Sequence, residues 1–212
     1  MRIVFFLLVV RIVFAQTDVY TEGTWAGRDA WQKPKELIRL LNVKEGGAVA
    51  DIGCHEGYMT VKLAQAVGSS GKIYGVDVDQ YKLDRLKQHL ASRGLANVEL
   101  IKGDYDDPKL PKNALDGVLV VDAYHEMDAY ESILQHIRVS LKAGGRLVIC
   151  EPIDDRRKNL SRKEQERKHE IGMNYVQQDL LAAGFNVIYA KEDFVDRVAI
   201  KGDRMWVVVA GK

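Results

Sequence analysis

The sequence predicts an α/β fold in which a mostly parallel sheet is covered by helices on both faces. Short apolar runs alternate with amphipathic helical segments between residues 34 and 150. Most of these runs are apolar throughout, which is typical of strands that are buried on both faces. No internal repeat, low-complexity tract or linker interrupts the 212 residues. We therefore expect one folded domain over residues 25–212, preceded by a segment of different character at residues 1–24.

The first half of the chain contains three predicted strands and three predicted helices. The first helix begins at Pro34, because proline suits the first helical turn and Leu37 and Leu41 then share one face. The same alternation continues after a glycine-containing turn at residues 44–47. We predict strands over residues 48–52, 72–76 and 98–101, and further helices over residues 58–67 and 81–92.

The second half begins with the same alternation and then changes. We predict strands over residues 115–121 and 146–150, with a helix over residues 129–141 between them. Ser161 and Glu164 form a capping box that predicts one long helix toward Ala183, ended by Gly184. Two further strands are predicted over residues 186–190 and 205–210, and a closing pair of this kind is typical of an antiparallel sheet edge.

The composition is that of an ordinary globular protein. It argues against a protein whose overall charge attracts nucleic acid or an anionic membrane. Apolar residues make up 47% of the chain and charged residues 29%, and the net charge is +1. No global field therefore attracts nucleic acid or an anionic membrane. The two cysteines, Cys54 and Cys150, form neither a disulfide framework nor a pattern with zinc-ligand spacing, so we expect buried thiols.

The N-terminus has the pattern of a secretory signal. In MRIVFFLLVVRIVFAQ an arginine precedes an apolar stretch from Ile3 to Ala15, which Arg11 interrupts. Val13-Phe14-Ala15 fits a cleavage site, and the stretch is short for a bilayer span. We predict that the protein is exported or is associated with a membrane through residues 1–15. The alternatives are an uncleaved surface anchor, or a mis-set start codon with a cytoplasmic protein.

The turn after the first predicted strand indicates the ligand class. It lies in VADIGCHEGYMTVKLA (residues 49–64), and open α/β sheets bind ligands at the carboxyl ends of such strands. The GxxxxGK[ST] pattern for a nucleoside triphosphate is absent. The GxGxxG pattern for a dinucleotide fails twice, because His55 and Tyr58 stand where glycines are required. The ligand class that is left is an adenosine joined to an amino acid. The pattern Asp51-x-Gly53-x-x-x-Gly57 suits the ammonium and carboxylate groups of such a ligand.

Acidic residues on the next two strands fit the same ligand. Asp77 ends the second strand 24 residues after Gly53, where a carboxylate can accept hydrogen bonds from both ribose hydroxyls. Val78 can cover one face of the adenine. Asp104 can accept from the adenine amino group, and Tyr105 can pack on the other face. The alternative for each acid is an ordinary turn or helix cap.

Six segments together resemble class I S-adenosylmethionine-dependent methyltransferases, and the resemblance runs from about Lys33 to the C-terminus. The segments are VADIGCHEGYMTVKLA, IYGVDVD, IKGDYDD, LDGVLVVDAYHEM, LKAGGRLVICEP and LLAAGFNVI. The resemblance implies a Rossmann-like three-layer αβα sandwich with seven strands, the last of them antiparallel, and S-adenosylmethionine as cofactor. The departure is His55, where the family most often has glycine.

The exit of the fourth strand, Asp122-Ala-Tyr-His-Glu126, is the predicted centre of the chemistry. The resemblance implies that this exit abuts the reacting methyl group, with the cofactor sulfur facing Asp122 and Tyr124. His125 can act as a base or an orienting group, since its pKa lies near neutrality, and Tyr124 can wall the acceptor pocket. The alternative for His125 is a residue that holds the loop by hydrogen bonds, and Glu126 is interpreted as a helix-start acid.

Other features have ordinary interpretations. Asp122 with Glu151, Asp154 or Asp155 could hold a hard divalent ion, but a matching asparagine is missing and we predict no metal. The basic run at residues 156–169 is interpreted as a solvated helix face, with an anionic substrate or lipid as the alternative. Trp25 and Trp31 suit either a lid or core packing.

These observations predict a methyltransferase that acts on a small-molecule acceptor by in-line displacement. No NPPY-like strand exit is present, which argues against methylation of nucleobase amino groups and against a nucleic-acid partner. The alternative is a non-catalytic exported protein that binds S-adenosylmethionine or a nucleoside. The acceptor, the methylated atom and the oligomeric state stay open at the level of the sequence.

Overall fold

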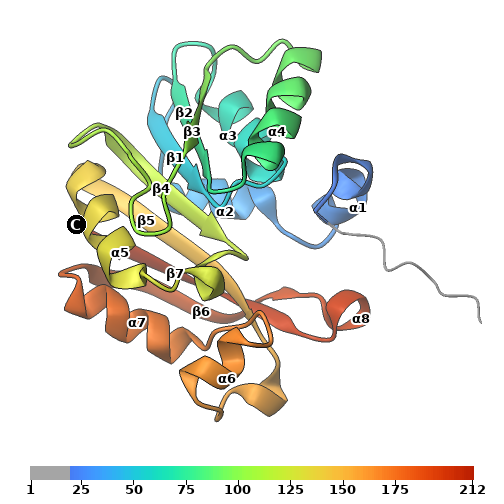
Figure 1. Cartoon of the computed structure of the whole chain (residues 1–212), viewed down its shortest axis with the longest axis vertical. Helices are drawn as coiled ribbons and strands as arrows, with labels where there is room; N and C mark the ends of the chain where they lie inside the picture. Colours follow the sequence, from blue (N-terminus) through green and yellow to red (C-terminus); the bar gives the residue numbers. More distant parts are fainter. Residues whose placement is uncertain (1–19) are drawn as a thin grey trace, which may run out of the picture.

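Seven strands form one sheet in the order β3-β2-β1-β4-β5-β7-β6 in the computed structural model, which describes residues 20–212 (Figure 1). The predicted signal segment and its cleavage site therefore lie outside the described residues. The strands are β1 Ala48–Ile52, β2 Lys72–Asp77, β3 Val98–Lys102, β4 Leu115–Val121, β5 Leu141–Ile153, β6 Asn186–Asp196 and β7 Arg204–Gly211. β7 is antiparallel to both neighbours, β5 and β6, and the remaining pairs are parallel. The predicted seven-stranded sheet is confirmed.

Two apolar clusters, one on each face of the sheet, make the three layers. The first cluster joins the sheet to α2 Pro34–Leu41, α3 Tyr58–Val67 and α4 Gln80–Ser92. The second joins the opposite face to α5 Tyr130–Ser140 and α7 Met173–Ala182. Neighbouring residues of a strand belong to different clusters, as Val49 and Ala50 of β1 do, because successive side chains of a strand point to opposite faces.

The strand order reverses between β1 and β4, and this reversal positions the site. The chain runs from β1 outward to β2 and β3, and then returns to pair β4 with the other edge of β1. Ligands of open α/β sheets bind at such a switch point, beyond the carboxyl ends of the strands. The predicted bounds of β1, α3 and β4 are confirmed to the residue.

The single long helix predicted after Ser161 is wrong. The capping box is present, since the Ser161 amide donates to Glu164 Oε2 at 3.0 Å, but α6 ends after Arg162–Glu166. The chain then turns through His169, whose φ is 56°, and Ile171 donates its amide to the Pro152 carbonyl of β5 at 3.1 Å. This bond holds the segment between the two helices against the sheet, and α7 begins at Met173 with Gly172 as its N-cap.

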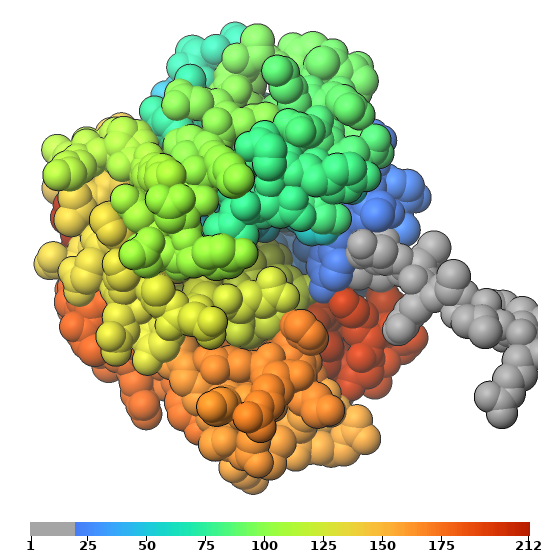
Figure 2. Space-filling view, viewed as in Figure 1, coloured from blue at the N-terminus to red at the C-terminus, as the bar shows by residue number. Residues whose placement is uncertain are grey.

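The N-terminal segment and the tip of the C-terminal hairpin lie close together beyond the carboxyl ends of the parallel strands. Helices α1 Trp25–Asp29 and α8 Val198–Lys201 lie there, the latter between the long strands β6 and β7 (Figure 1). Figure 2 shows the blue N-terminal residues seated between the green residues around α4 and the red C-terminal hairpin. β6 forms the edge of the sheet, so the closing antiparallel pair was predicted correctly but β7 lies inside the sheet.

Within residues 20–212, the structure contains no helix that combines the length and apolar character needed to cross a membrane.

Candidate active site

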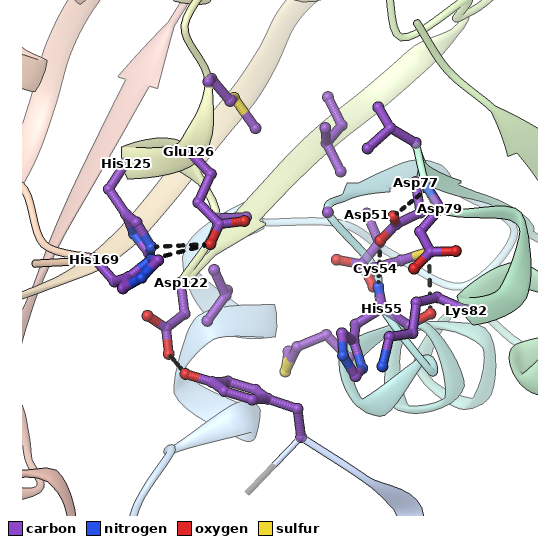
Figure 3. Close-up of a pocket in the computed structure, with 18 of the residues that line it drawn as sticks. Asp51, Cys54, His55, Asp77, Asp79, Lys82, Asp122, His125, Glu126 and His169 are labelled. Atoms are coloured by element: carbon purple, nitrogen blue, oxygen red, sulfur yellow. Dashed lines mark hydrogen bonds and ion pairs between the residues drawn. The ribbon is translucent and has the colours of Figure 1, made fainter. Parts of the chain in front are cut away.

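A cavity of about 780 Å³ lies over the switch point, between β1, β2 and β4 on one side and the N-terminal segment with the C-terminal hairpin on the other. Of the ten residues predicted for the site, eight line it: Asp51, Gly53, Asp77, Val78, Asp104, Tyr105, Asp122 and His125. Its side chains fall into two groups that face each other across the cavity (Figure 3). One group surrounds Asp51 and Asp77, and the other surrounds His125.

Two glycines shape the turn after β1, but only one of them borders the cavity. Gly53 has a φ of 73°, and a Cβ there would lie 2.5 Å from the Ala123 Cβ at the exit of β4. Glycine therefore lets the two loops approach each other. Gly57 has a φ of 95°, and a Cβ there would lie 2.1 Å from Leu86 of α4. Gly57 does not line the cavity, so its role is helix packing instead of the predicted cofactor contact.

His55 occupies the position where the family most often has glycine. Its φ of 50° lies in the left-handed region, which explains why glycine suits this position. Its backbone amide donates to Asp77 Oδ2 at 2.8 Å, which ties the turn to the end of β2. The imidazole lines the cavity, 5.7 Å from the Tyr20 ring between centroids.

Asp51 and Arg28 are buried, oppositely charged residues that both line the cavity. Asp51 is buried, its Oδ2 accepts a hydrogen bond from Thr60 at 2.6 Å, and burial raises its pKa to about 6. Arg28 of α1 is 6% exposed, and its guanidinium lies 4.2 Å from the centre of the Tyr58 ring. It forms no ion pair with an acidic side chain among residues 20–212, and burial lowers its pKa. An ammonium and a carboxylate on one ligand would complement these two side chains.

Sequence reasoning missed Arg28. Its segment, residues 23–33, is polar and aromatic and follows no motif. Only the folding of α1 onto α3 brings the guanidinium to the cavity, and the sequence carries no local signal of that contact.

Asp77 has both carboxylate oxygens engaged at the end of β2. Oδ2 accepts from the His55 amide at 2.8 Å and Oδ1 from the Asp79 amide at 2.9 Å. Each carboxylate oxygen has a second lone pair, so the group can accept two further hydrogen bonds from a diol. The outer part of this end is open, since Tyr105 is largely exposed and Asp104 pairs with Lys109 at 2.9 Å.

Asp122 is held by residues from both ends of the described chain. Its Oδ2 accepts from the Tyr20 hydroxyl at 2.6 Å and from Arg197 Nη1 at 2.7 Å. Burial acts to raise the pKa of Asp122, but the Arg197 guanidinium, together with Tyr20 and His125, outweighs burial and lowers the pKa to about 2. Arg197 also binds Asp203, so one buried cation pairs with two carboxylates here. Sequence reasoning missed Arg197, which lies in the charged stretch between the last two strands.

His125 is oriented by a buried glutamate. Its Nδ1 lies 2.6 Å from Glu151 Oε2, and Glu151 Oε1 accepts the backbone amides of Ala123 and Tyr124 at 2.7 and 2.9 Å. With Glu151 ionised, Nδ1 carries the proton and Nε2 is free to accept or bind. Burial acts to lower the pKa of His125, but Glu151 together with Asp122 and Glu126 outweighs burial, so the pKa lies above its ordinary value. Nδ1 therefore holds the loop, as the alternative interpretation predicted, and Nε2 lies on the side of Glu126.

Tyr124 was predicted to wall the acceptor pocket, and this prediction is wrong. Its side chain is buried, its hydroxyl donates to Asp179 Oδ2 of α7 at 2.9 Å, and it does not line the cavity. The exit of β4 forms a short 3₁₀ turn over Tyr124–Glu126, which directs this ring into the core below α5 and α7.

Two of the carboxylates considered for a hard divalent ion, Asp154 and Asp155, are occupied by cationic side chains. Asp154 binds Arg156 at 2.5 Å, and Asp155 binds Lys158 and Arg204 at 2.9 and 2.7 Å. A different residue from the basic run reaches the cavity instead. His169 Nδ1 lies 3.3 Å from Glu126 Oε1, beside His125 (Figure 3).

The strand order, the reversed β7 and the acidic cavity at the switch point define a Rossmann-like α/β domain that binds an adenosine-type ligand. A family model described as "Methyltransferase domain" matches residues 43–198. The chain belongs to this methyltransferase family, and its fold is that of the class I S-adenosylmethionine-dependent enzymes.

Curated relatives and solved structures agree with this membership. The demethylmenaquinone methyltransferase of Geobacillus stearothermophilus is 33% identical over 116 residues, which cover 55% of this chain and 49% of that protein. That of Bacillus subtilis is 30% identical over 116 residues, covering 55% and 50%. The chain thus spans about half the length of the curated relatives it matches.

The fold is similar to that of a SAM-dependent methyltransferase from Aquifex aeolicus, with a TM-score of 0.72 and 23% identity over 87% of this chain and 92% of that one. It is also similar to a geranyl diphosphate methyltransferase solved in complex with SAM, with a TM-score of 0.69 and 13% identity over 93% of each chain.

Proposed function

We propose that this chain transfers a methyl group from S-adenosylmethionine to a small-molecule acceptor. The observation that carries the proposal is that the buried, oppositely charged Asp51 and Arg28 line the same cavity as Asp77. Their charges complement the ammonium and the carboxylate of a methionine moiety, and Asp77 retains lone pairs for a ribose diol. The donor set of the cavity therefore fits S-adenosylmethionine.

Each lining residue then has a role in holding the cofactor. Asp51 faces the ammonium and Arg28 the carboxylate, while the turn at Gly53 lets the chain pass close to both. Asp77 accepts from the ribose hydroxyls. Val78 and Tyr105 cover the adenine, and Asp104 accepts from its amino group. The open outer part of this end gives the adenosine a route of entry.

The opposite end of the cavity receives the acceptor. S-adenosylmethionine supplies a methyl group activated by sulfonium, so the chain must chiefly position the acceptor for in-line attack, which can lower the barrier by about 7–11 kcal/mol. Asp122 stays ionised through Arg197 and presents negative charge near the site. His125 presents Nε2 on this side because Glu151 fixes Nδ1.

A small-molecule acceptor is supported by the relatives. The relatives that are named demethylmenaquinone methyltransferases match this chain along about half of their own length. Met127 and Ile133 line the cavity together with charged residues, so we propose an acceptor that has both an apolar body and a polar reacting group. Export or membrane association through residues 1–15 is also a proposal, which mass spectrometry of the N-terminus of the native protein would test.

Calorimetry of the full chain with S-adenosylmethionine, and then with its demethylated product, tests the proposal. We expect saturable binding of both, and transfer of a labelled methyl group to at least one member of a panel of hydroquinones, phenols and thiols. Failure to bind either ligand would refute the proposal. Binding of both without transfer to any acceptor would favour the non-catalytic binding protein.

A further inference from the structure

Three side chains from two separate segments meet at the acceptor end of the cavity. Glu126 Oε1 lies 3.8 Å from His125 Nε2 and 3.3 Å from His169 Nδ1. One nitrogen or oxygen from each of the three residues lies within 4.8 Å of the other two. Figure 3 shows the three side chains converging beside Asp122. The proposed cofactor site requires neither Glu126 nor His169.

The separations suit a metal ion of the zinc type. Ligand atoms about 2.0–2.2 Å from a tetrahedral centre lie about 3.3–3.6 Å apart. The separation of 3.3 Å between His169 Nδ1 and Glu126 Oε1 lies at the lower limit of this range. The separation of 3.8 Å between His125 Nε2 and Glu126 Oε1 lies slightly above its upper limit. Glu126 and His169 are exposed, with side chains that are 65% and 76% accessible, so small rotations can close the remaining difference.

The partner of His125 supports the same conclusion. Histidines that bind metals almost always donate their second ring N–H to a carboxylate or carbonyl, which orients the ring and raises the basicity of the ligating nitrogen. Glu151 makes this contact with His125 Nδ1 at 2.6 Å, and it is fully buried. The nitrogen left for a metal is Nε2, which is the one directed toward Glu126.

Charged side chains around the cluster both favour and oppose the binding of a cation. The carboxylates of Glu151, Glu126 and Asp122 all face His125 and favour a cation there. Arg157 and Lys168 line the same cavity and oppose it. The guanidinium of Arg157 is committed to Glu170 and Asp154, which reduces its effect.

We propose that His125 Nε2, Glu126 and His169 bind a divalent transition-metal ion such as Zn²⁺ at the acceptor end of the cavity. Two imidazoles and one carboxylate are a ligand set of catalytic zinc sites, which keep a fourth position open. The open position would take an anionic oxygen or sulfur of the acceptor. This role of the ion rests on the proposed function, but its binding does not. The ion takes the lone pair of Nε2, so His125 then positions the acceptor through the ion instead of acting as a base.

Cobalt is a suitable probe, because Co²⁺ replaces Zn²⁺ in such sites and its visible absorption reports a low-coordinate N/O environment. The metal-stripped full chain is titrated with Co²⁺, and we expect one ion per chain. His169→Ala and Glu126→Gln should each weaken Co²⁺ binding by about tenfold or more. Both side chains are exposed, so neither change removes core packing. His136→Ala is the matched control, since His136 is exposed and belongs to neither group of side chains in the cavity.

The outcomes separate the two proposals. Absence of the cobalt spectrum in the unaltered chain, or equal affinity in His169→Ala, would overturn the metal site. Loss of affinity in His136→Ala alone would overturn it as well, because the ion would then lie elsewhere. Calorimetry of the unaltered chain with S-adenosylmethionine is run in parallel. If Co²⁺ binds and S-adenosylmethionine does not, the proposed function fails and the metal site stands.

Discussion

Arg197 Nη1 donates to Asp122 Oδ2 at 2.7 Å, and the two residues are 75 positions apart in the sequence. Both side chains are buried, at 2% and 3% accessibility. The bond fastens the C-terminal hairpin to the exit of β4, and the Tyr20 hydroxyl joins the same carboxylate from the N-terminal side. The acceptor end of the cavity is thus enclosed by segments that are remote in sequence.

Replacement of Arg197 by methionine should destabilise the protein strongly. It leaves the carboxylates of Asp122 and Asp203 buried without their cation, and breaking a buried pair in this way costs about 3–5 kcal/mol. Urea denaturation measures the change in the free energy of unfolding. Lys158→Met is the matched control, because Lys158 pairs with Asp155 and Glu192 at the surface and such pairs contribute about 0–1 kcal/mol. Equal effects of the two changes would contradict the buried-pair interpretation.

The affinity for S-adenosylmethionine should rise with pH through the titration of Asp51. Burial raises the pKa of Asp51 from 3.8 to about 6 in the absence of ligand, so at about pH 5 most chains carry the neutral acid, which binds an ammonium poorly. We expect binding about tenfold weaker at about pH 5 than at about pH 8, by calorimetry. Asp51→Asn should bind weakly at both pH values. A pH dependence that survives in Asp51→Asn would assign the titration to another group.

The same shift predicts a change in stability with the opposite sign. The folded-state pKa of Asp51 exceeds the unfolded value, so protonation stabilises the fold below about pH 4, and this contribution is lost as the pH rises through about 6. The Asp51→Asn variant has no such group. Its free energy of unfolding relative to the unaltered chain should therefore increase between about pH 4 and pH 7, by about 3 kcal/mol.

Arg28→Met should reduce the affinity for S-adenosylmethionine and spare the affinity for adenosine. A hydrogen bond to a charged group contributes about 1.5–3 kcal/mol, which corresponds to about 10-fold to 150-fold in the dissociation constant. Adenosine lacks the carboxylate that Arg28 is proposed to bind. Arg39→Met, on the exposed side of α2, is the control. If both ligands lose affinity equally in Arg28→Met, the change acts on the whole cavity and not on the carboxylate.

Asp77→Ala should weaken binding of both S-adenosylmethionine and adenosine by at least about tenfold, because both ligands carry the ribose diol. Asp77 also accepts the amides of His55 and Asp79, so part of the loss will come from the turn itself. Binding of a 2′,3′-dideoxy analogue separates the two effects. We expect its weak affinity to change little in Asp77→Ala, whereas an equal loss would indicate that Asp77 acts only on the turn.

His55→Gly should be tolerated. The backbone φ of 50° costs a non-glycine residue about 1–2 kcal/mol, and glycine relieves that strain while keeping the amide that donates to Asp77. We expect the affinity for S-adenosylmethionine to stay within about threefold or to increase, which is less than about 0.7 kcal/mol. A loss of tenfold or more would mean that the imidazole itself contacts the ligand.

The sequence predicts the sheet well because the strands of this fold are buried on both faces. Largely apolar runs such as Leu115–Val121 show where a strand begins and ends, and glycines mark the turns around β1. The break between α6 and α7 was not predicted, although Gly172 stands within it and is the N-cap of α7, because the hydrogen bond from Ile171 to β5 is a tertiary contact that the sequence does not show.

The site was predicted where its residues follow strands directly and missed where they come from elsewhere. Asp51, Asp77 and Asp122 lie at the carboxyl ends of β1, β2 and β4, so the order of the strands brings them together. Arg28 and Arg197 reach the cavity from α1 and the C-terminal hairpin, and no local pattern in the sequence distinguishes them from charged residues that stay on the surface. His169 reaches it from the loop after α6, although an ordinary surface histidine was the preferred interpretation.

Tyr20 adds a practical consequence for protein production. A version of the protein that begins at residue 25 would lack the phenol that donates to Asp122 and contacts Lys201. The shortened enzyme would keep its sheet and lose one of the residues that line the cavity. Low turnover of such a shortened protein would then reflect the loss of Tyr20. A version that begins before Tyr20 is therefore preferable for assays.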